Sequence, residues 1–198
     1  MIPTDSTPTT HEHVAGTIRR VLRSETHLIE EHLLRLEADA RHRRFGHDVS
    51  DQFVHTYALH AADLGNLTFG FFVEGEIRAI AELRQSGRAF GHTAEVAFSV
   101  ERQFSNMGIG TKLMGRIIRA ARNRGLHHLL LVCLRDNIKM QAIARHYGAD
   151  LNIEDGSIVA DIIPKRADYV SYASEYLDDR MVFVQAAFDL QARLGRAS

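Results

Sequence analysis

The chain has 198 residues, of which 45% are hydrophobic, 25% charged and 8% aromatic, a balance that excludes disordered and fibrous proteins and indicates one globular domain. Its 24 Lys and Arg residues nearly cancel its 25 Asp and Glu residues, so the net charge of -1 gives no overall field for nucleic acid or an anionic membrane. The single cysteine, Cys133, excludes an internal disulfide and a zinc ribbon. We therefore expect a cytoplasmic protein that binds neither nucleic acid nor membrane.

The chain divides into three parts by composition. No stretch is apolar enough to span a bilayer, and the first residues lack the basic start and apolar middle of a signal peptide. We expect residues 1–15 to be a disordered polar tail, residues 16–165 to be the main domain, and residues 166–198 to be a C-terminal helical extension.

Apolar residues at helical spacing predict two helices first, one between Ser24 and Ala40 and one after Ser50, a good N-cap residue. The basic run at residues 41–47 is interpreted as a solvated helix end, with contact to an anion as the alternative. Later elements are a hairpin of Leu67–Val73 and Ile77–Leu83 around Glu74-Gly75-Glu76, a strand at Ala94–Val100, a helix at Ile109–Arg124, a strand at His128–Leu134, a helix at Ile138–Tyr147, and strands at Leu151–Ile153 and Ile158–Ile163.

The final segment begins near Asp168 and has apolar residues at helical spacing. It is expected to be a helix that is broken or bent near Asp178-Asp179 and that clamps onto the sheet or forms a dimer. The whole pattern predicts a mixed α/β fold.

The segment from Ala94 to Met114 carries the most information about chemistry, because there a strand ends, a short loop turns and a helix opens at Gly108 and Gly110. A helix start presents unpaired backbone N–H groups, and glycines without a Cβ let a phosphate approach them. The segment therefore predicts a phosphate or pyrophosphate site, to which Lys112 and Arg116 add positive charge. The alternative is that the two glycines only allow close packing of the helix on the sheet.

This segment, followed by a strand and by N-x-x-M-x-x-I-A-x-x-Y-G from Asn137 to Gly148, resembles the acyl-CoA-binding core of the GNAT superfamily of N-acetyltransferases. The resemblance extends from about Leu67 to Ile163 and includes the order of the elements. Ala94-Glu95-Val96-Ala97 and the Asn-x-x-Met helix look most like bacterial protein-lysine acetyltransferase domains. The resemblance implies a GNAT-type α/β fold for residues 16–165, with a mixed, mostly antiparallel central sheet flanked by helices.

The same resemblance implies that acetyl-CoA is the co-substrate and that the acetyl group moves by direct attack of a primary amine. The acceptor partner would be a small molecule or a protein lysine or N-terminus, and a homodimer is possible. The alternative is a non-catalytic acyl-CoA-binding regulatory module. A nucleotide-binding α/β domain is disfavoured because the Walker lysine and the three-glycine fingerprint are both absent.

Several site residues follow from the resemblance. Phe98, Ser99 and Val100 would lie along the acetyl-pantetheine arm, and Asn137 would contact the cofactor, although it could also serve as an N-cap. The turn that would hold the pyrophosphate consists of Asn106, Met107, Gly108, Ile109, Gly110 and Thr111.

Two positions depart from the family pattern. Ser105 stands where the family usually has Arg or Gln, so phosphate binding is weaker or is supplied by Arg102 and Lys112. Ala144 stands where many members carry a tyrosine that protonates the departing thiolate. Tyr147, three residues later, is the candidate for this acid, with a tyrosine that only packs as the alternative.

The reaction also needs a base, because an alkyl ammonium with a pKa near 10.4 is only about 0.04% free base at pH 7. Glu95 shares one strand face with Ala97 and Ser99 and is the candidate base, with an ion pair to an arginine at the sheet rim as the alternative. His92 is the reserve. Backbone N–H groups of residues 98–100, where the strand parts from its neighbour, would hold the oxyanion.

Neither a thiol nucleophile nor a metal is expected. Cys133 alternates with apolar residues in an expected interior strand, which predicts a buried, inert thiol. The histidines at His11-Glu12-His13 and at His127-His128 lack the spacing of metal ligands.

Overall fold

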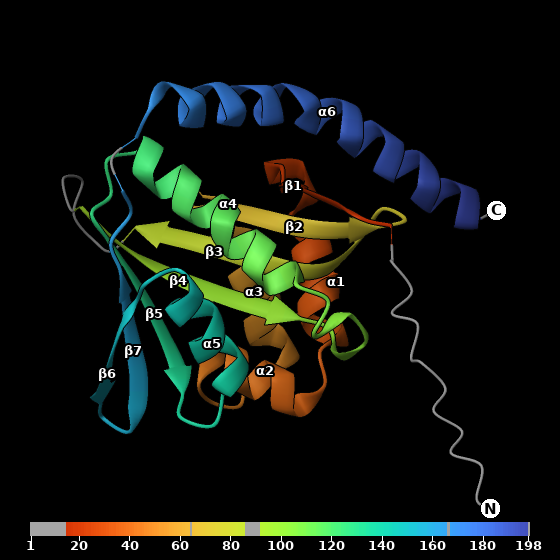
Figure 1. Cartoon of the computed structure of the whole chain (residues 1–198). Coiled ribbons are helices and arrows are strands. Elements are labelled where there is room, and N and C mark those ends of the chain that lie inside the picture. Colours follow the sequence, from red (N-terminus) through yellow and green to blue (C-terminus); the bar gives the residue numbers. More distant parts are fainter. Residues whose placement is uncertain (1–14, 64, 86–91, 166, 198) are drawn as a thin grey trace, which may run out of the picture.

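The computed structural model describes residues 15–63, 65–85, 92–165 and 167–197, so the predicted tail lies almost wholly outside the described residues. Its centre is a seven-stranded sheet of order β1-β2-β3-β4-β5-β7-β6 (Figure 1). Only β4 and β5 pair in parallel among these described strands. The strands are β1 (Thr17–Arg20), β2 (Leu67–Val73), β3 (Glu76–Gln85), β4 (Thr93–Val100), β5 (His128–Leu134), β6 (Asp150–Glu154) and β7 (Ser157–Ile162).

Helices cover both faces of this sheet, which confirms the predicted fold class (Figure 1). The α-helices are α1 (Thr26–Arg35), α2 (Ala38–Phe45), α3 (Asp51–His60), α4 (Ile109–Asn123), α5 (Ile138–His146) and α6 (Tyr169–Ala197). One face carries α4 and α5, and the other carries α1, α2 and α3. The long helix α6 lies outside these layers and contacts α4 and β1.

Each face has its own apolar core. Leu113 and Ile117 of α4 are fully buried against Ala79 and Ala81 of β3 in the larger core. Ile29 and Leu33 of α1 pack against β3 from the other side in the smaller core. Because both faces of β2 and β3 are covered, these strands are apolar runs rather than clean alternations.

The β2–β3 hairpin turns at Glu74 and Gly75, whose φ angles of 52° and 81° both lie in the left-handed region. Glycine at the second position accommodates this backbone without a Cβ clash. The hairpin is therefore confirmed where the sequence predicts it.

The structure corrects four expectations. The edge strand β1 was not predicted, and the first predicted helix is two helices, because α1 ends at Arg35 and α2 begins at Ala38. Helix α6 runs unbroken through Asp178-Asp179, where Asp178 is paired with two arginines of α4. The basic run ends α2, but its Arg44 side chain is 5% exposed and paired with Glu82, so it is not a solvated cation.

Among the described residues, no helix is both long enough and apolar enough to cross a membrane.

Candidate active site

The central feature of the site is the point where β4 and β5 part. Their parallel pairing runs from Thr93 with His128 to Val96 with Leu131 and stops there. On its other side, β4 stays paired with β3 as far as Val100. The last four residues of β4 therefore have a partner strand on one side only within the described sheet.

The backbone groups at this open edge can be oriented from the ladder. The N–H of Glu101 donates to the Arg78 carbonyl at 3.0 Å, in continuation of the β3–β4 register. Because an antiparallel ladder alternates, the amide of Ser99 also faces β3, whereas those of Phe98 and Val100 face the side from which β5 has parted. Two N–H donors thus point to the position where the sequence predicts the acyl arm.

The side chains of the three residues predicted to lie along the acyl arm do not all point to the same face of the sheet. Phe98 and Val100 pack at the edge of the larger core, beside α4. The Ser99 side chain points to the opposite face and lies 2.9 Å from His32 Nε2 of α1.

The predicted phosphate turn lies directly after this strand and opens α4. Asn106 and Gly108 both have positive φ angles, 64° and 73°. The Gly108 carbonyl accepts from the Lys112 N–H at 3.1 Å, so the amides of Ile109, Gly110 and Thr111 fall in the first helical turn and lack acceptors within the helix.

Side chains do not fill this turn. A Cβ on Gly108 would meet no atom within 4 Å and Gly108 is exposed, so this glycine serves the backbone conformation and leaves open space beside the turn. A Cβ on Gly110 would come within 2.9 Å of Ile143 Cδ1, so the packing alternative applies to Gly110 alone. Met107 packs on the core and Ile109 is buried, which leaves backbone at the surface. The turn can therefore accept a phosphate group.

The cations around the turn differ in their availability. Arg116 forms an ion pair with Asp178 of α6, and burial together with Arg119 lowers its pKa. Arg102 is largely exposed and lies 3.2 Å from Glu37. Lys112 is exposed in the first turn, so it is better placed than Arg116 to face an anion.

Asn137 begins the next helix. Its Oδ1 accepts the Met140 N–H at 3.2 Å, so the N-cap interpretation is confirmed. Contact of Asn137 with the cofactor stays a prediction.

Glu95 is exposed on β4, four residues before Ser99 and on the same face. Arg84 of β3 lies directly opposite it in the register, as the rim-pairing alternative expects. The Arg84 guanidinium lies 4.7 Å from the centre of the Tyr57 ring. His92 precedes the far end of β4, about 23 Å from Ser99 along an extended strand, and its ring stacks on His127.

Tyr147 is bound to α4. Its hydroxyl donates to the Thr111 carbonyl at 2.8 Å, and burial raises its pKa. A Cβ on Gly115 would come within 3.0 Å of this hydroxyl, so the glycine makes room for the contact. Ala144 is fully buried in the core.

Two buried polar networks on the face of α1–α3 were not predicted from the sequence. In one, His32 Nδ1 lies 3.2 Å from Glu101, which Arg35 and Arg78 also contact. In the other, Glu82 of β3 bonds Arg44 and the Tyr57 hydroxyl. A single glutamate inside the apolar strand sequence A-I-A-E-L was the available signal for the second network.

The remaining predictions concern the thiol and metals. Cys133 is buried on β5, and this burial raises the pKa of its thiol, as expected for an inert cysteine. In the part of the chain that the structure describes, no three His, Cys, Asp or Glu side chains gather as metal ligands would.

Comparison with known proteins relates this geometry to a family. The model of the acetyltransferase (GNAT) family matches residues 30–149. The GNAT domain of S. lividans PAT is 21% identical, with a TM-score of 0.66 over 75% of this chain and 90% of that chain. The cAMP-binding acyltransferase from Mycobacterium smegmatis is 22% identical, with a TM-score of 0.56 over 89% of this chain and 52% of that chain. The yncA protein of Salmonella typhimurium, solved with its cofactor acetyl-CoA, is 17% identical, with a TM-score of 0.57 over 78% of this chain and 96% of that chain.

Proposed function

Because the chain belongs to the acetyltransferase (GNAT) family, whose members are acetyl-CoA-dependent N-acetyltransferases, we propose that it transfers acetyl to a primary amine by direct attack. The acceptor is an amine of a small molecule or of a protein, at a lysine or the N-terminus. The observation that carries the proposal is the parting of β4 from β5 directly before the open, glycine-started turn of α4.

The turn of residues 106–111 would hold the pyrophosphate of CoA. Its accessible amides and the positive end of the helix dipole favour a negative group, and Lys112 adds a cation. The pantetheine arm would run along the open edge of β4, beside residues 98–100, with Asn137 contacting the cofactor from the start of α5.

Bound acetyl-CoA supplies a thioester whose carbonyl carbon the amine attacks. The amides of Phe98 and Val100 would stabilise the negative charge that develops on the thioester oxygen. Glu95 would take the proton of the amine, directly or through water. The departing thiol has a pKa of about 8.5, so it leaves readily and needs little help from an acid. Tyr147 is the candidate for that acid, and a tyrosine that only packs is the alternative.

Two measurements test the proposal. The first is calorimetric titration with CoA of a Gly108→Glu variant, which places a carboxylate in the turn and is expected to abolish binding. Gly46→Glu is the matched control, because Gly46 also has a positive φ, 77°, and a Cβ added there would likewise meet no atom within 4 Å. Equal CoA affinity in both variants would contradict the phosphate site.

The second measurement is release of free thiol from acetyl-CoA in the presence of a panel of amines, including polyamines, aminosugars and lysine-containing peptides. Amine-dependent release is expected. Tight CoA binding without release for any amine would favour the non-catalytic acyl-CoA-binding module.

A further inference from the structure

The long helix α6 has the reverse of the usual amphipathic arrangement. Apart from Val182, which is 3% exposed, the side that faces the domain is mainly polar and ion-paired, although a surface helix normally turns its apolar side inward. Asp189 lies 2.8 Å from Arg19, whose side chain is only 1% exposed. Further pairs join Glu175 to Arg124, Asp178 to Arg119, Arg193 to Glu31 and Arg196 to Glu74.

These pairs fix the rotation of α6 about its own axis. Turning the apolar side inward would leave Arg19 buried beside Glu25 without its second carboxylate, and it would break the contacts of Asp178 with α4. Breaking one partner of a buried pair is costly. The outward orientation of the apolar side is therefore specified by the chain itself.

The outer side of α6 gathers most of the exposed apolar side chains of the protein. In the part of the chain that the structure describes, eleven of the seventeen exposed large apolar residues belong to this helix. They are Tyr169, Val170, Tyr172, Tyr176, Leu177, Met181, Phe183, Val184, Phe188, Leu190 and Leu194. Single exposed apolar residues are ordinary, but a strip of this size along the outer half of one helix, interrupted by Arg180, marks a contact surface.

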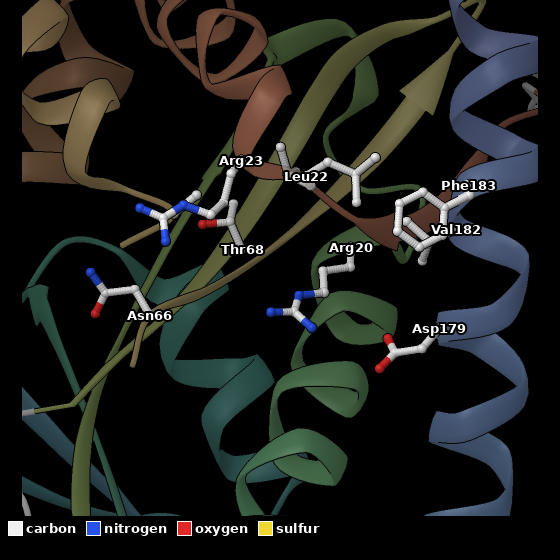
Figure 2. A pocket seen from close by; sticks show the side chains of 10 residues that line it. Arg20, Leu22, Arg23, Asn66, Thr68, Asp179, Val182 and Phe183 are labelled. Carbon is white, nitrogen blue, oxygen red and sulfur yellow. The ribbon is translucent and has the colours of Figure 1, made fainter. Parts of the chain in front are cut away.

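Between α6 and the edge of the sheet lies a pocket of about 280 Å³, where Val182 and Phe183 stand beside Leu22 of the loop after β1 (Figure 2). Val182, which lines this pocket, is 3% exposed, whereas Phe183 remains 70% exposed. The domain therefore covers Val182 at this point, and the exposed strip continues on both sides of it.

The strip has the size and spacing of a helix–helix contact. Eleven side chains that each expose on the order of 100 Å² give about 1,100 Å², compared with about 800 Å² buried per partner in a standard stable interface. Leu177, Met181, Val184 and Phe188 follow one another at intervals of four, three and four residues, the spacing of a seam between two packed helices.

The charges of α6 favour a protein partner over a lipid surface. A helix that lies on a membrane flanks its apolar face with many Lys and Arg residues. The described part of α6 has no lysine and three arginines: Arg193 and Arg196 are paired with glutamates of the domain, and the exposed Arg180 lies over the Tyr176 ring, 5.4 Å from its centre. A second copy of the chain carries the same apolar strip, and a two-fold contact joins identical faces, so this partner requires no other protein.

We propose that the outer side of α6 is the interface of a homodimer, in which α6 of one chain packs against α6 of a second copy. The proposal is independent of acetyl transfer, because residues 95–111 and Asn137 take no part in it.

The test is sedimentation velocity of the full chain between about 1 and 100 µM, concentrations that bracket a micromolar Kd. The wild type is expected to sediment as a dimer of the 22.3 kDa chain. Leu177→Glu with Phe188→Glu is expected to sediment as a monomer. Leu59→Glu is the matched control, because Leu59 is a 54% exposed leucine on α3, and it is expected to remain a dimer.

A wild type that is monomeric throughout, including one that instead binds vesicles of anionic lipid, would overturn the proposal. A dimer that survives the double substitution would also overturn it. If circular dichroism shows that this variant does not fold, a cross-linking experiment takes its place. It uses three variants, each with one of the substitutions Leu177→Cys, Met181→Cys and Val184→Cys. At least one is expected to form a disulfide-linked dimer on mild oxidation while Leu59→Cys does not, and no cross-link at any position would overturn the proposal.

Discussion

The His32 imidazole joins helix α1 to the C-terminal end of β4, with Nε2 2.9 Å from Ser99 Oγ. Its Nδ1 lies 3.2 Å from Glu101, so both ring nitrogens have partners although the ring is 0% exposed. With a hydrogen on Nδ1, the neutral ring donates to the Glu101 carboxylate and accepts from the Ser99 hydroxyl. This polar contact fixes β4 at the point where β5 no longer supports it.

We expect the stability of the fold to decrease as the pH falls below about 6.5, the pKa of an unfolded histidine. Burial lowers the pKa of His32, an effect that the nearby Arg35 reinforces and that Glu101 and Glu82 oppose. Protonation therefore favours the unfolded chain, and the stabilisation is present above pH 6.5 and lost as the pH falls through the folded pKa. Urea unfolding at pH 7.5 and 5.5 measures this difference.

His32→Gln is expected to reduce the difference between these two pH values and to cost about 1–3 kcal/mol at pH 7.5, since buried partners lose hydrogen bonds. The control is His55→Gln, whose side chain is 48% exposed. Glu101 does not titrate in this window. Burial would raise its pKa, but hydrogen bonds from His32 and Arg35 lower it to about 2. An unchanged pH dependence in His32→Gln would contradict the assignment.

The pair of Arg44 and Glu82 predicts a larger effect on stability. The two side chains are 5% and 1% exposed, and the Tyr57 hydroxyl donates to the Glu82 carboxylate at 3.0 Å. Glu82→Leu alone leaves the buried Arg44 guanidinium without its carboxylate partner, and we expect a loss of about 3–5 kcal/mol in urea unfolding. Replacing Arg44 by Leu as well is expected to recover part of this loss.

The control for this pair is Asp136→Asn, which removes an exposed partner of Arg43 and is expected to change the free energy of unfolding by less than about 1 kcal/mol. A double substitution that loses the full sum of both single losses would show that the two charges do not act as a pair.

The strands from Leu67 onward could be predicted because each carries its own apolar pattern between clear turn residues. The edge strand β1 could not, because T-I-R-R has a single apolar residue and gains its place only by pairing with β2. Helix α2 has no apolar stripe, since its sequence is A-D-A-R-H-R-R-F. Its position depends on ion pairs with residues far along the chain.

Some features of the candidate site could likewise be predicted from the sequence, and others could not. The glycine-started turn of α4 could be predicted, because a phosphate turn depends on local backbone chemistry at Gly108. The pairing of Arg116 with Asp178 could not, because α6 approaches α4 only in the folded chain. The same holds for the contact of His32 with Ser99, which joins residues 67 positions apart.

Glu95→Gln is expected to lower the turnover of acetyl transfer by about 10²-fold or more, the usual contribution of a general base, while the Kd for CoA changes little. The substitution keeps the size of the side chain and removes its ability to accept a proton. Steady-state turnover from pH 6 to 9 and calorimetric CoA binding separate the two effects.

Glu154→Gln is the control for this change, because Glu154 is also an exposed strand glutamate but lies on β6, at the far edge of the sheet. Full activity of Glu95→Gln across the whole pH range would remove Glu95 from the mechanism and favour the alternative of an ion pair with Arg84, which lies opposite it in the register.

Tyr147→Phe distinguishes an acid from a packing residue. The hydroxyl proton is already donated to the Thr111 carbonyl, so we expect a loss of about 0.5–1.5 kcal/mol of stability, the worth of one hydrogen bond, and a decrease in turnover of less than about tenfold. Urea unfolding and steady-state turnover are measured on the same preparation. If turnover instead fell by about 10²-fold with the Kd for CoA unchanged, Tyr147 would be the acid that Ala144 fails to supply.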